Sequence, residues 1–292
     1  MKLALGTVQF GLDYGIANCR GRVPAEEVKQ ILQTARSAGV DTLDTAIGYG
    51  DSETVLGHAG VDGFRVITKV GAMPQEVTNR AEAVVWLRAE VAKSCARLGK
   101  SQLDGLLLHR PEQLMGEAGV WLAQALHAVR DEGLVQKIGF SIYSPDALPS
   151  LCHVVHPDLV QAPMSLVDQR LITSGWLDRL ASRGSEVHVR SVFLQGLLLQ
   201  SHAELPNQFA RWRPVWQRWQ QWLADTRRDA LSSCIHFAMG QPAVSRVVVG
   251  VDSVSQFKQI VESARDAATQ PAWPALACDD ERLINPSLWS TA

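Results

Sequence analysis

Short apolar runs alternate with longer segments of helical period about eight times along the chain, and this alternation constrains the fold most strongly. We expect strands at 3–7, 40–45, 65–70, 103–108, 136–141, 158–162, 187–192 and 245–250. Parallel strands that are buried on both faces have continuous apolar runs, because helices cover both sides of the sheet. Eight such units predict a closed (β/α)₈ TIM barrel, in a single domain that spans residues 1–292.

The segments between the strands carry helix boundary signals. The first helix is expected to start at Pro24 and to end before Gly39, and its buried stripe is Val28, Ile31, Leu32 and Ala35. Segment 79–98 places an apolar face on Ala81, Val84, Val85, Val91, Ala92, Cys95 and Leu98. Further helices are predicted at 119–132, 145–155, 170–183, 228–239 and 253–268.

An insertion at 196–227 separates the seventh predicted strand from its helix, where two to six residues usually suffice. It contains four tryptophans and four arginines, and Trp216, Trp219 and Leu223 share one face of an amphipathic helix after Pro214. We favour an interpretation in which this helix packs its indoles on the barrel rim and walls a substrate pocket. A protein interface, a membrane surface or nucleic acid are the alternatives. A tail follows at 270–292.

Bulk properties exclude several classes of function. A net charge of −2 gives no electrostatic reason to expect nucleic acid or an anionic membrane. The five cysteines are scattered, no apolar run is long enough to span a membrane, and the N-terminus does not resemble a signal peptide. We therefore expect a cytoplasmic protein, monomeric or weakly homo-oligomeric. His153 and His156 have helical i,i+3 spacing but no third ligand nearby, so they predict a surface pair and no metal site.

Four polar residues end predicted strands or lie just beyond them: Asp44, Tyr49, Lys69 and His109. The carboxyl ends of neighbouring strands converge at one face of a barrel, so these side chains can meet. A phenol is a weak acid at neutral pH, and an adjacent ammonium such as Lys69 favours its ionised form. Asp44 would balance the charge of Lys69, and His109 would orient a carbonyl oxygen. This set can protonate an alkoxide but needs an external hydride source.

The chain resembles the aldo-keto reductase family in three motifs, DTAIGYGDSE, ITKV and DGLLLHRP, in this order and spacing. The resemblance implies reduction of a small aldehyde or ketone by NADPH or NADH. It further implies that Tyr49 is the general acid, that Lys69 makes the phenol more acidic, that Asp44 supports Lys69, and that His109 positions the carbonyl. In the same motif, Ser52 and Glu53 are expected to have a structural role, with Ser52 or Asp51 capping a helix.

The resemblance also implies cofactor-binding positions, namely Thr7, Asp44, Ser141, Gln161, Ser191, Phe193, Leu194, Gly196, Gly250, Asp252, Ser253 and Gln256. Two positions depart from the family pattern. Ile142 replaces the asparagine that follows Ser141, and Ser191 is assigned to the place of an aromatic ring that stacks on the nicotinamide. Phe193 would take over that place only if the backbone shifts.

The loop after the eighth predicted strand reads VGVDSVSQFKQ, and Asp252 would repel the 2′-phosphate of NADPH. Lys258 is the nearest compensating base in sequence, so we expect NADH to bind at least as well as NADPH. The family's N-terminal hairpin plug is missing, because the first strand is expected close to Met1. The barrel floor would then be closed by side chains or by another segment such as the tail.

A second hypothesis assigns the chain to a different class. It would be an NAD(H)-binding regulatory protein that retains the reductase fold with little or no turnover and contacts a partner through the insertion. Ile142 and Ser191 are its support in the sequence, whereas the four-residue set favours the enzyme.

Overall fold

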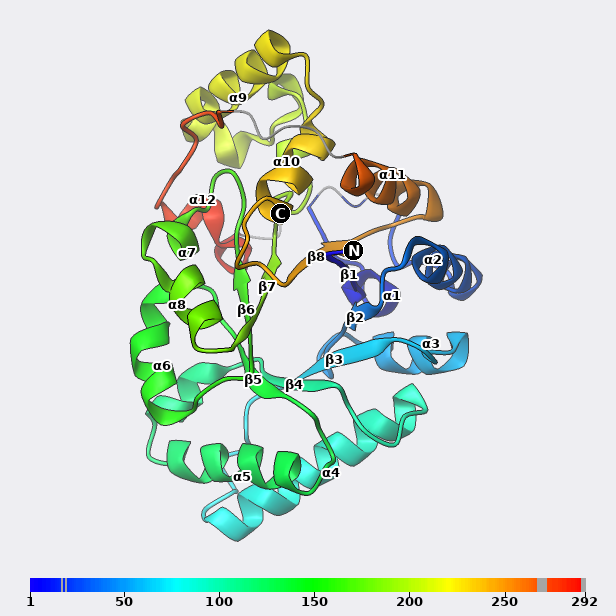
Figure 1. The fold of residues 1–292 in the computed structure, drawn as a ribbon, viewed down its shortest axis with the longest axis vertical. Coiled ribbons are helices and arrows are strands. Elements are labelled where there is room, and N and C mark those ends of the chain that lie inside the picture. The colour runs from blue at the N-terminus through cyan, green and yellow to red at the C-terminus, as the bar shows by residue number, and fades with distance from the viewer. Residues whose placement is uncertain (17, 19, 267–271, 290–292) are drawn as a thin grey trace.

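A computed structural model describes residues 1–16, 18, 20–266 and 272–289, and its eight parallel strands close into a barrel in sequence order (Figure 1). The strands are β1 (Leu3–Gly6), β2 (Thr42–Asp44), β3 (Arg65–Val70), β4 (Gly105–Leu108), β5 (Ile138–Ser141), β6 (Leu159–Pro163), β7 (Glu186–Arg190) and β8 (Arg246–Gly250). Pairing of Leu3 with Val247 joins β1 to β8 and completes the closure. The predicted (β/α)₈ barrel is confirmed.

The predicted strand ends were less accurate than the strands themselves. Leu103 forms only an isolated bridge to Val135, so β4 begins two residues later than expected. The seventh strand ends at Arg190, because Ser191 has a φ of 63° and turns the chain out of the sheet. Ser191 therefore lies just beyond β7, whereas the predicted strand 187–192 had placed it inside the strand.

Helices surround the barrel in Figure 1. They are α1 (Val8–Gly11), α2 (Ala25–Ala38), α3 (Ser52–Ala59), α4 (Arg80–Leu98), α5 (Gly119–Asp131), α6 (Leu148–Val154), α7 (Arg170–Thr173), α8 (Trp176–Ser182), α9 (Arg213–Thr226), α10 (Ala230–Met239), α11 (Val254–Arg265) and α12 (Glu281–Ile284). Gly175 has a φ of 72° and divides the predicted helix 170–183 into α7 and α8. The last two residues of the predicted helix 253–268 lie outside the described residues.

Two helices show how well sequence periodicity predicts a buried face. The stripe predicted for α2 is confirmed, and Gly39 ends this helix with a φ of 75°. The face predicted for α4 was partly wrong, because the buried residues are Ala83, Leu87, Val91, Ser94 and Leu98. Val85 is 63% exposed. Ser94 is buried because its hydroxyl donates to the carboxylate of Glu53, so a polar residue lies in the inward stripe.

The insertion 196–227 folds into three 3₁₀ turns (Leu197–Leu199, His202–Glu204 and Asn207–Trp212) followed by α9. The predicted amphipathic helix is confirmed, with Trp216 and Trp219 fully buried. Their indole N–H groups donate to the carbonyls of Leu197 and Leu198, at 3.2 and 3.0 Å. These two tryptophans thus anchor the insertion to the segment that follows β7.

The floor of the barrel is closed by charged and polar side chains from the starts of the strands. Arg65 contacts Glu186 at 3.7 Å and donates to the hydroxyl of Thr42, and Lys137 donates to Glu186 at 2.5 Å. Above them, Ile67, Leu107 and Leu159 form a small buried cluster of their own. The floor is therefore closed by side chains, one of the two alternatives raised by the sequence.

The tail packs at the opposite, carboxyl end of the strands, so the alternative in which it plugs the floor was wrong. The Cys278 N–H donates to the carbonyl of Val167 beyond β6, and Glu281 pairs with Arg170 of α7 at 3.2 Å. Figure 1 accordingly places α12 beside α7. Residues 270, 271 and 290–292 of the tail lie outside the described part of the chain. Within the described part, no helix combines the length and apolar content that a membrane span requires.

Candidate active site

Asp44 and Lys69 form a buried ion pair at the carboxyl ends of β2 and β3. The Lys69 ammonium is fully buried and donates to Asp44 Oδ2 at 2.7 Å and to the Thr45 carbonyl at 2.8 Å. The other carboxylate oxygen of Asp44 accepts from Gln161 Nε2 at 2.6 Å. Burial lowers the pKa of Lys69, but the charges of Asp44 and Tyr49 outweigh it and raise the pKa above the ordinary 10.5. Lys69 is therefore a fixed positive charge at neutral pH.

Tyr49 and His109 complete the cluster from the loops that follow β2 and β4. The Lys69 ammonium lies 4.9 Å from the centre of the Tyr49 ring. The rings of Tyr49 and His109 are nearly perpendicular, with centroids 5.8 Å apart. Burial, followed by the charges of Lys69 and Arg190, lowers the pKa of His109 from 6.5 to about 4. The imidazole is thus neutral at physiological pH, and the structure brings all four predicted residues together.

Ser52 and Glu53 fix the loop that carries Tyr49. Ser52 Oγ donates to the carbonyl of Thr7 at 2.8 Å. The buried Glu53 carboxylate accepts from Thr68 of β3 at 2.6 Å and from Arg97 of α4 at 2.7 Å. The predicted cap was wrong, because Asp51 precedes α3 without a side-chain capping bond. Ser52 and Glu53 therefore have structural roles, because their buried contacts tie α3 to the barrel.

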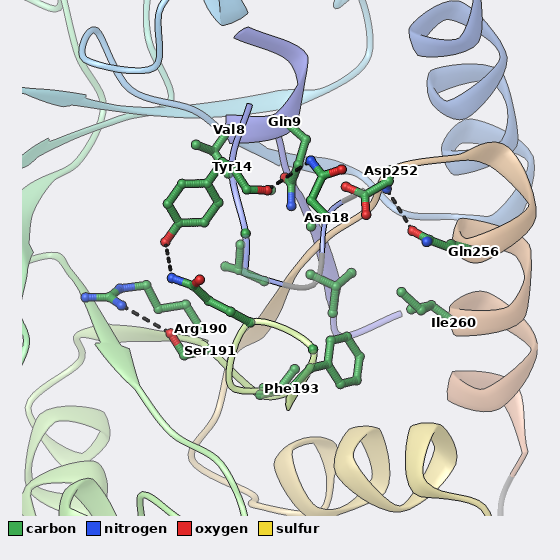
Figure 2. A pocket seen from close by; sticks show the side chains of 18 of the residues that line it. Val8, Gln9, Tyr14, Asn18, Arg190, Ser191, Phe193, Asp252, Gln256 and Ile260 are labelled. Carbon is green, nitrogen blue, oxygen red and sulfur yellow. Dashed lines mark hydrogen bonds between the residues drawn. The ribbon is translucent and has the colours of Figure 1, made fainter. Parts of the chain in front are cut away.

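A cavity of about 970 Å³ opens beside this cluster, and Tyr49 and His109 line one end of it. The other end is lined by Asp252, Gln256 and Ile260, which come from the loop after β8 and from α11 (Figure 2). Between them, Gln195 Nε2 donates to the phenol oxygen of Tyr14 at 3.1 Å. This contact links the loop after β1 to the loop after β7.

Most of the predicted cofactor residues line this cavity, namely Thr7, Asp44, Ser141, Ser191, Phe193, Gly196, Gly250, Asp252 and Gln256. Gln161, Leu194 and Ser253 are not among the lining residues. The amide of Gln161 lies between Asp44 and Ser141, whose hydroxyl donates to it at 3.4 Å. Leu194 is fully buried, and Ser253 caps α11 by accepting from the Gln256 N–H.

The insertion lines the cavity through its 3₁₀ turns, and its tryptophan-rich helix does not contribute to the lining. The lining residues from the insertion are Gly196, Leu199, Gln200 and Glu204, all from its 3₁₀ part. No tryptophan of α9 is among the lining residues in the described part of the chain. The prediction that this helix walls the pocket was therefore wrong, because no residue of α9 (Arg213–Thr226) lines the cavity and the indoles of Trp216 and Trp219 hold the insertion in place.

Sequence reasoning missed several lining residues, above all Arg190, Tyr143, Gln9 and Tyr14. Arg190 is the last residue of β7, but the predicted strand 187–192 ended two residues later, so Arg190 was not recognised as a strand-end residue. Gln9 lies on α1, a single helical turn directly after β1 that has no capping signal. Correct prediction of where β1 and β7 end would have identified Gln9 and Arg190 as residues at the mouth of the barrel.

Unsatisfied acceptors at the Asp252 end of the cavity fit a ligand with hydroxyl groups. Gln9 Oε1 and Asp252 Oδ1 are buried and have no hydrogen-bond partner within the described residues. A Cβ at Gly250 would lie 2.7 Å from the Gln9 amide, so this glycine keeps the amide in place. Burial raises the pKa of Asp252, and the charge of Arg20 opposes this shift. Ribose hydroxyls are donors of the kind that such acceptors require.

The closed barrel and the cluster at its mouth define a class of enzyme, and comparisons with known proteins identify its family. The model for the aldo/keto reductase family matches residues 2–273, and the chain belongs to this family. Members generally use NAD(P)H, and the unsatisfied acceptors above fit the ribose part of such a dinucleotide. The protein is an oxidoreductase.

Individual relatives agree with this assignment. A D-threo-aldose 1-dehydrogenase of a Pseudomonas species is 29% identical, over 96% of each chain. A D-arabinose 1-dehydrogenase of Saccharomyces cerevisiae is 30% identical over 42% of this chain and 38% of its own. Among solved structures, the holo form of an aldo-keto reductase of Bacillus halodurans has a TM-score of 0.74 at 18% identity, and covers 96% of this chain and 95% of its own. At that identity the similarity supports the fold alone.

Proposed function

We propose that the protein reduces an aldehyde or ketone to an alcohol with NADH or NADPH. The observation that carries this proposal is the buried Lys69–Asp44 pair, which lies against the ring of Tyr49 at the wall of the cavity. A bound dihydronicotinamide supplies the hydride that none of these side chains can provide. The chain's own residues supply the proton and hold the carbonyl group.

In this proposal Tyr49 donates its phenolic proton to the carbonyl oxygen as the oxygen gains charge. The Lys69 ammonium stabilises the phenolate that remains, and Asp44 keeps that ammonium charged and in place. A neutral His109 has one ring N–H to donate to the same oxygen without competing as an acid. General acid catalysis of this kind typically contributes about 10²–10⁴-fold to the rate.

The substrate is proposed to be a small hydroxylated carbonyl compound such as an aldose. The names of two relatives specify aldoses, and both refer to oxidation at carbon 1. The cavity wall near Tyr49 carries the polar side chains of His109 and Tyr143, which can bind substrate hydroxyls. The same acid–base set operates in either direction, so the enzyme is tested for both reduction and oxidation.

Replacing Tyr49 with Phe tests the role of the phenol. Turnover of aldoses, aldehydes and ketones should fall by at least about 10²-fold, while cofactor affinity stays within about twofold. Tyr14→Phe removes another phenol oxygen from the same cavity and should retain turnover. Unchanged turnover in Tyr49→Phe would remove this residue from its role. If wild type binds cofactor tightly but turns over no substrate in the panel, the regulatory alternative is favoured.

We further propose that the protein accepts NADH at least as well as NADPH. Asp252 lines the cavity and has an unpaired buried oxygen, which would repel a phosphate and accept from a ribose hydroxyl. Lys258 is exposed and is not among the lining residues. Fluorescence titration of wild type and Asp252→Asn with both cofactors tests this. The variant should gain affinity for NADPH relative to NADH, whereas wild type binding NADPH tenfold more tightly would contradict the proposal.

A further inference from the structure

Arg190 is the last residue of β7 that faces the axis of the barrel. Successive residues of a strand point to opposite sides, so Glu186, His188 and Arg190 share one side. Glu186 belongs to the floor, where it binds Lys137, and His188 is fully buried above it. Arg190 is the next residue of β7 on this side of the strand, and its side chain lines the cavity at the mouth of the barrel (Figure 2).

Three contacts hold the Arg190 guanidinium across the ends of two strands. One nitrogen donates to the Ile142 carbonyl at 3.0 Å, just beyond β5, and another donates to Ser191 Oγ at 3.2 Å. The guanidinium carbon also lies 4.7 Å from the centre of the Tyr143 ring. Strand β6 lies between β5 and β7, so the guanidinium reaches across the end of β6 to the residue that follows Ser141.

The charge of Arg190 is not balanced by a neighbouring carboxylate. No Asp or Glu oxygen in the described part of the chain lies within 4.0 Å of its guanidinium, and its hydrogen bonds go to neutral oxygens. The negative charge of Asp44 is already paired with Lys69. The cavity wall beside Ser141 therefore carries the positive charge of Arg190, which also helps to lower the pKa of His109.

We propose that Arg190 sets the redox preference of the site by discriminating between the two charge states of a nicotinamide. The ring is cationic in the oxidised cofactor and neutral in the reduced one, so a fixed guanidinium nearby weakens binding of the oxidised form only. This inference rests on the proposed function and on the family resemblance, which assigns Ser141 to the cofactor and Ser191 to the place of the ring that stacks on the nicotinamide. Arg190 is here a specificity-determining residue that favours carbonyl reduction over oxidation of an alcohol.

The expected effect is large enough to measure. Two like unit charges on the order of 8 Å apart, at an effective dielectric constant of about 20, repel each other enough to change a dissociation constant by about tenfold or more. The quantity to compare is the ratio of the dissociation constants of oxidised and reduced cofactor within one protein. Any general loss of affinity through altered packing cancels in this ratio.

Titration of wild type, Arg190→Lys and Arg190→Gln with NAD⁺ and NADH tests the proposal. The oxidised-to-reduced ratio should fall about tenfold in Arg190→Gln and stay within about threefold of wild type in Arg190→Lys, which keeps the charge. Thermal unfolding checks that both variants fold. An unchanged ratio in Arg190→Gln, or an equal fall in both variants, overturns the inference. If wild type binds neither form, and neither NADP⁺ nor NADPH, the proposed function itself fails.

Discussion

Replacing Asp44 with Asn would remove the negative charge that pairs with the buried ammonium of Lys69 and would leave this ammonium with neutral acceptors such as the Thr45 carbonyl. Breaking a buried ion pair from one side usually costs about 3–5 kcal/mol of the free energy of unfolding, because the other charge stays buried. Lys69 can escape this cost by releasing its proton. From an ordinary pKa of 10.5, deprotonation at pH 7 costs about 4.8 kcal/mol. The loss should therefore lie between about 3 and 5 kcal/mol, a large share of a typical domain's stability.

The pH dependence separates this cause from a general defect in packing. In wild type the folded pKa of Lys69 is raised, so its stabilising contribution is complete below pH 10.5 and is lost only as the pH rises through the folded value. In Asp44→Asn the folded pKa should be depressed by burial. The unfolded state then binds more protons, so the variant should gain stability as the pH rises from 7 towards 10.5.

Urea unfolding followed by tryptophan fluorescence at pH 7, 8 and 9 measures both effects. Asp51→Asn is a matched control, because Asp51 is 71% exposed in a surface pair with Arg22 and should lose at most about 1 kcal/mol. Adding Lys69→Met to Asp44→Asn should recover part of the loss, since no charge is then left unpaired. A loss below about 1 kcal/mol in Asp44→Asn, or stability that does not rise with pH, would refute the reasoning.

Two further predictions concern His109 and the insertion. Because the folded pKa of His109 is about 4 against an ordinary 6.5, its contribution to stability is present above pH 6.5 and is lost as the pH falls towards 4. His109→Asn should make the free energy of unfolding in urea less dependent on pH in that range, and an unchanged pH dependence would contradict the lowered pKa of His109. Trp219 is fully buried, so Trp219→Ala should cost about 3–5 kcal/mol, more than the same change at the half-buried Trp222. Equal losses would show that α9 is not anchored through Trp219.

The barrel was predictable because its signal is repeated eight times, so errors of one or two residues at strand ends do not change the topology. The four-residue cluster was predictable for a related reason. A barrel brings successive strand ends to one face, which makes Asp44, Lys69 and His109 neighbours despite their distance in sequence. Neither inference needed an exact register.

Features that depend on register or on distant partners were not predictable. The chain leaves β7 at Ser191 with a positive φ but without a glycine or asparagine to mark the turn, so Arg190 was overlooked. Gln161 was assigned to the cofactor, yet its amide donates to Asp44, 117 residues away. No local pattern distinguishes an amide that holds a carboxylate from one that binds a ligand. Tertiary packing decides between them.

Glu53 has a consequence for how sequences like this one are compared. Its carboxylate joins α3 to β3 and α4 whether or not any substrate is turned over. A descendant that lost Tyr49 would still be stabilised by these contacts of Glu53, and would still carry most of the motif around it. The motif as a whole therefore records ancestry, and in the function proposed here the residues within it that distinguish a working enzyme from a silent copy are Asp44 and Tyr49.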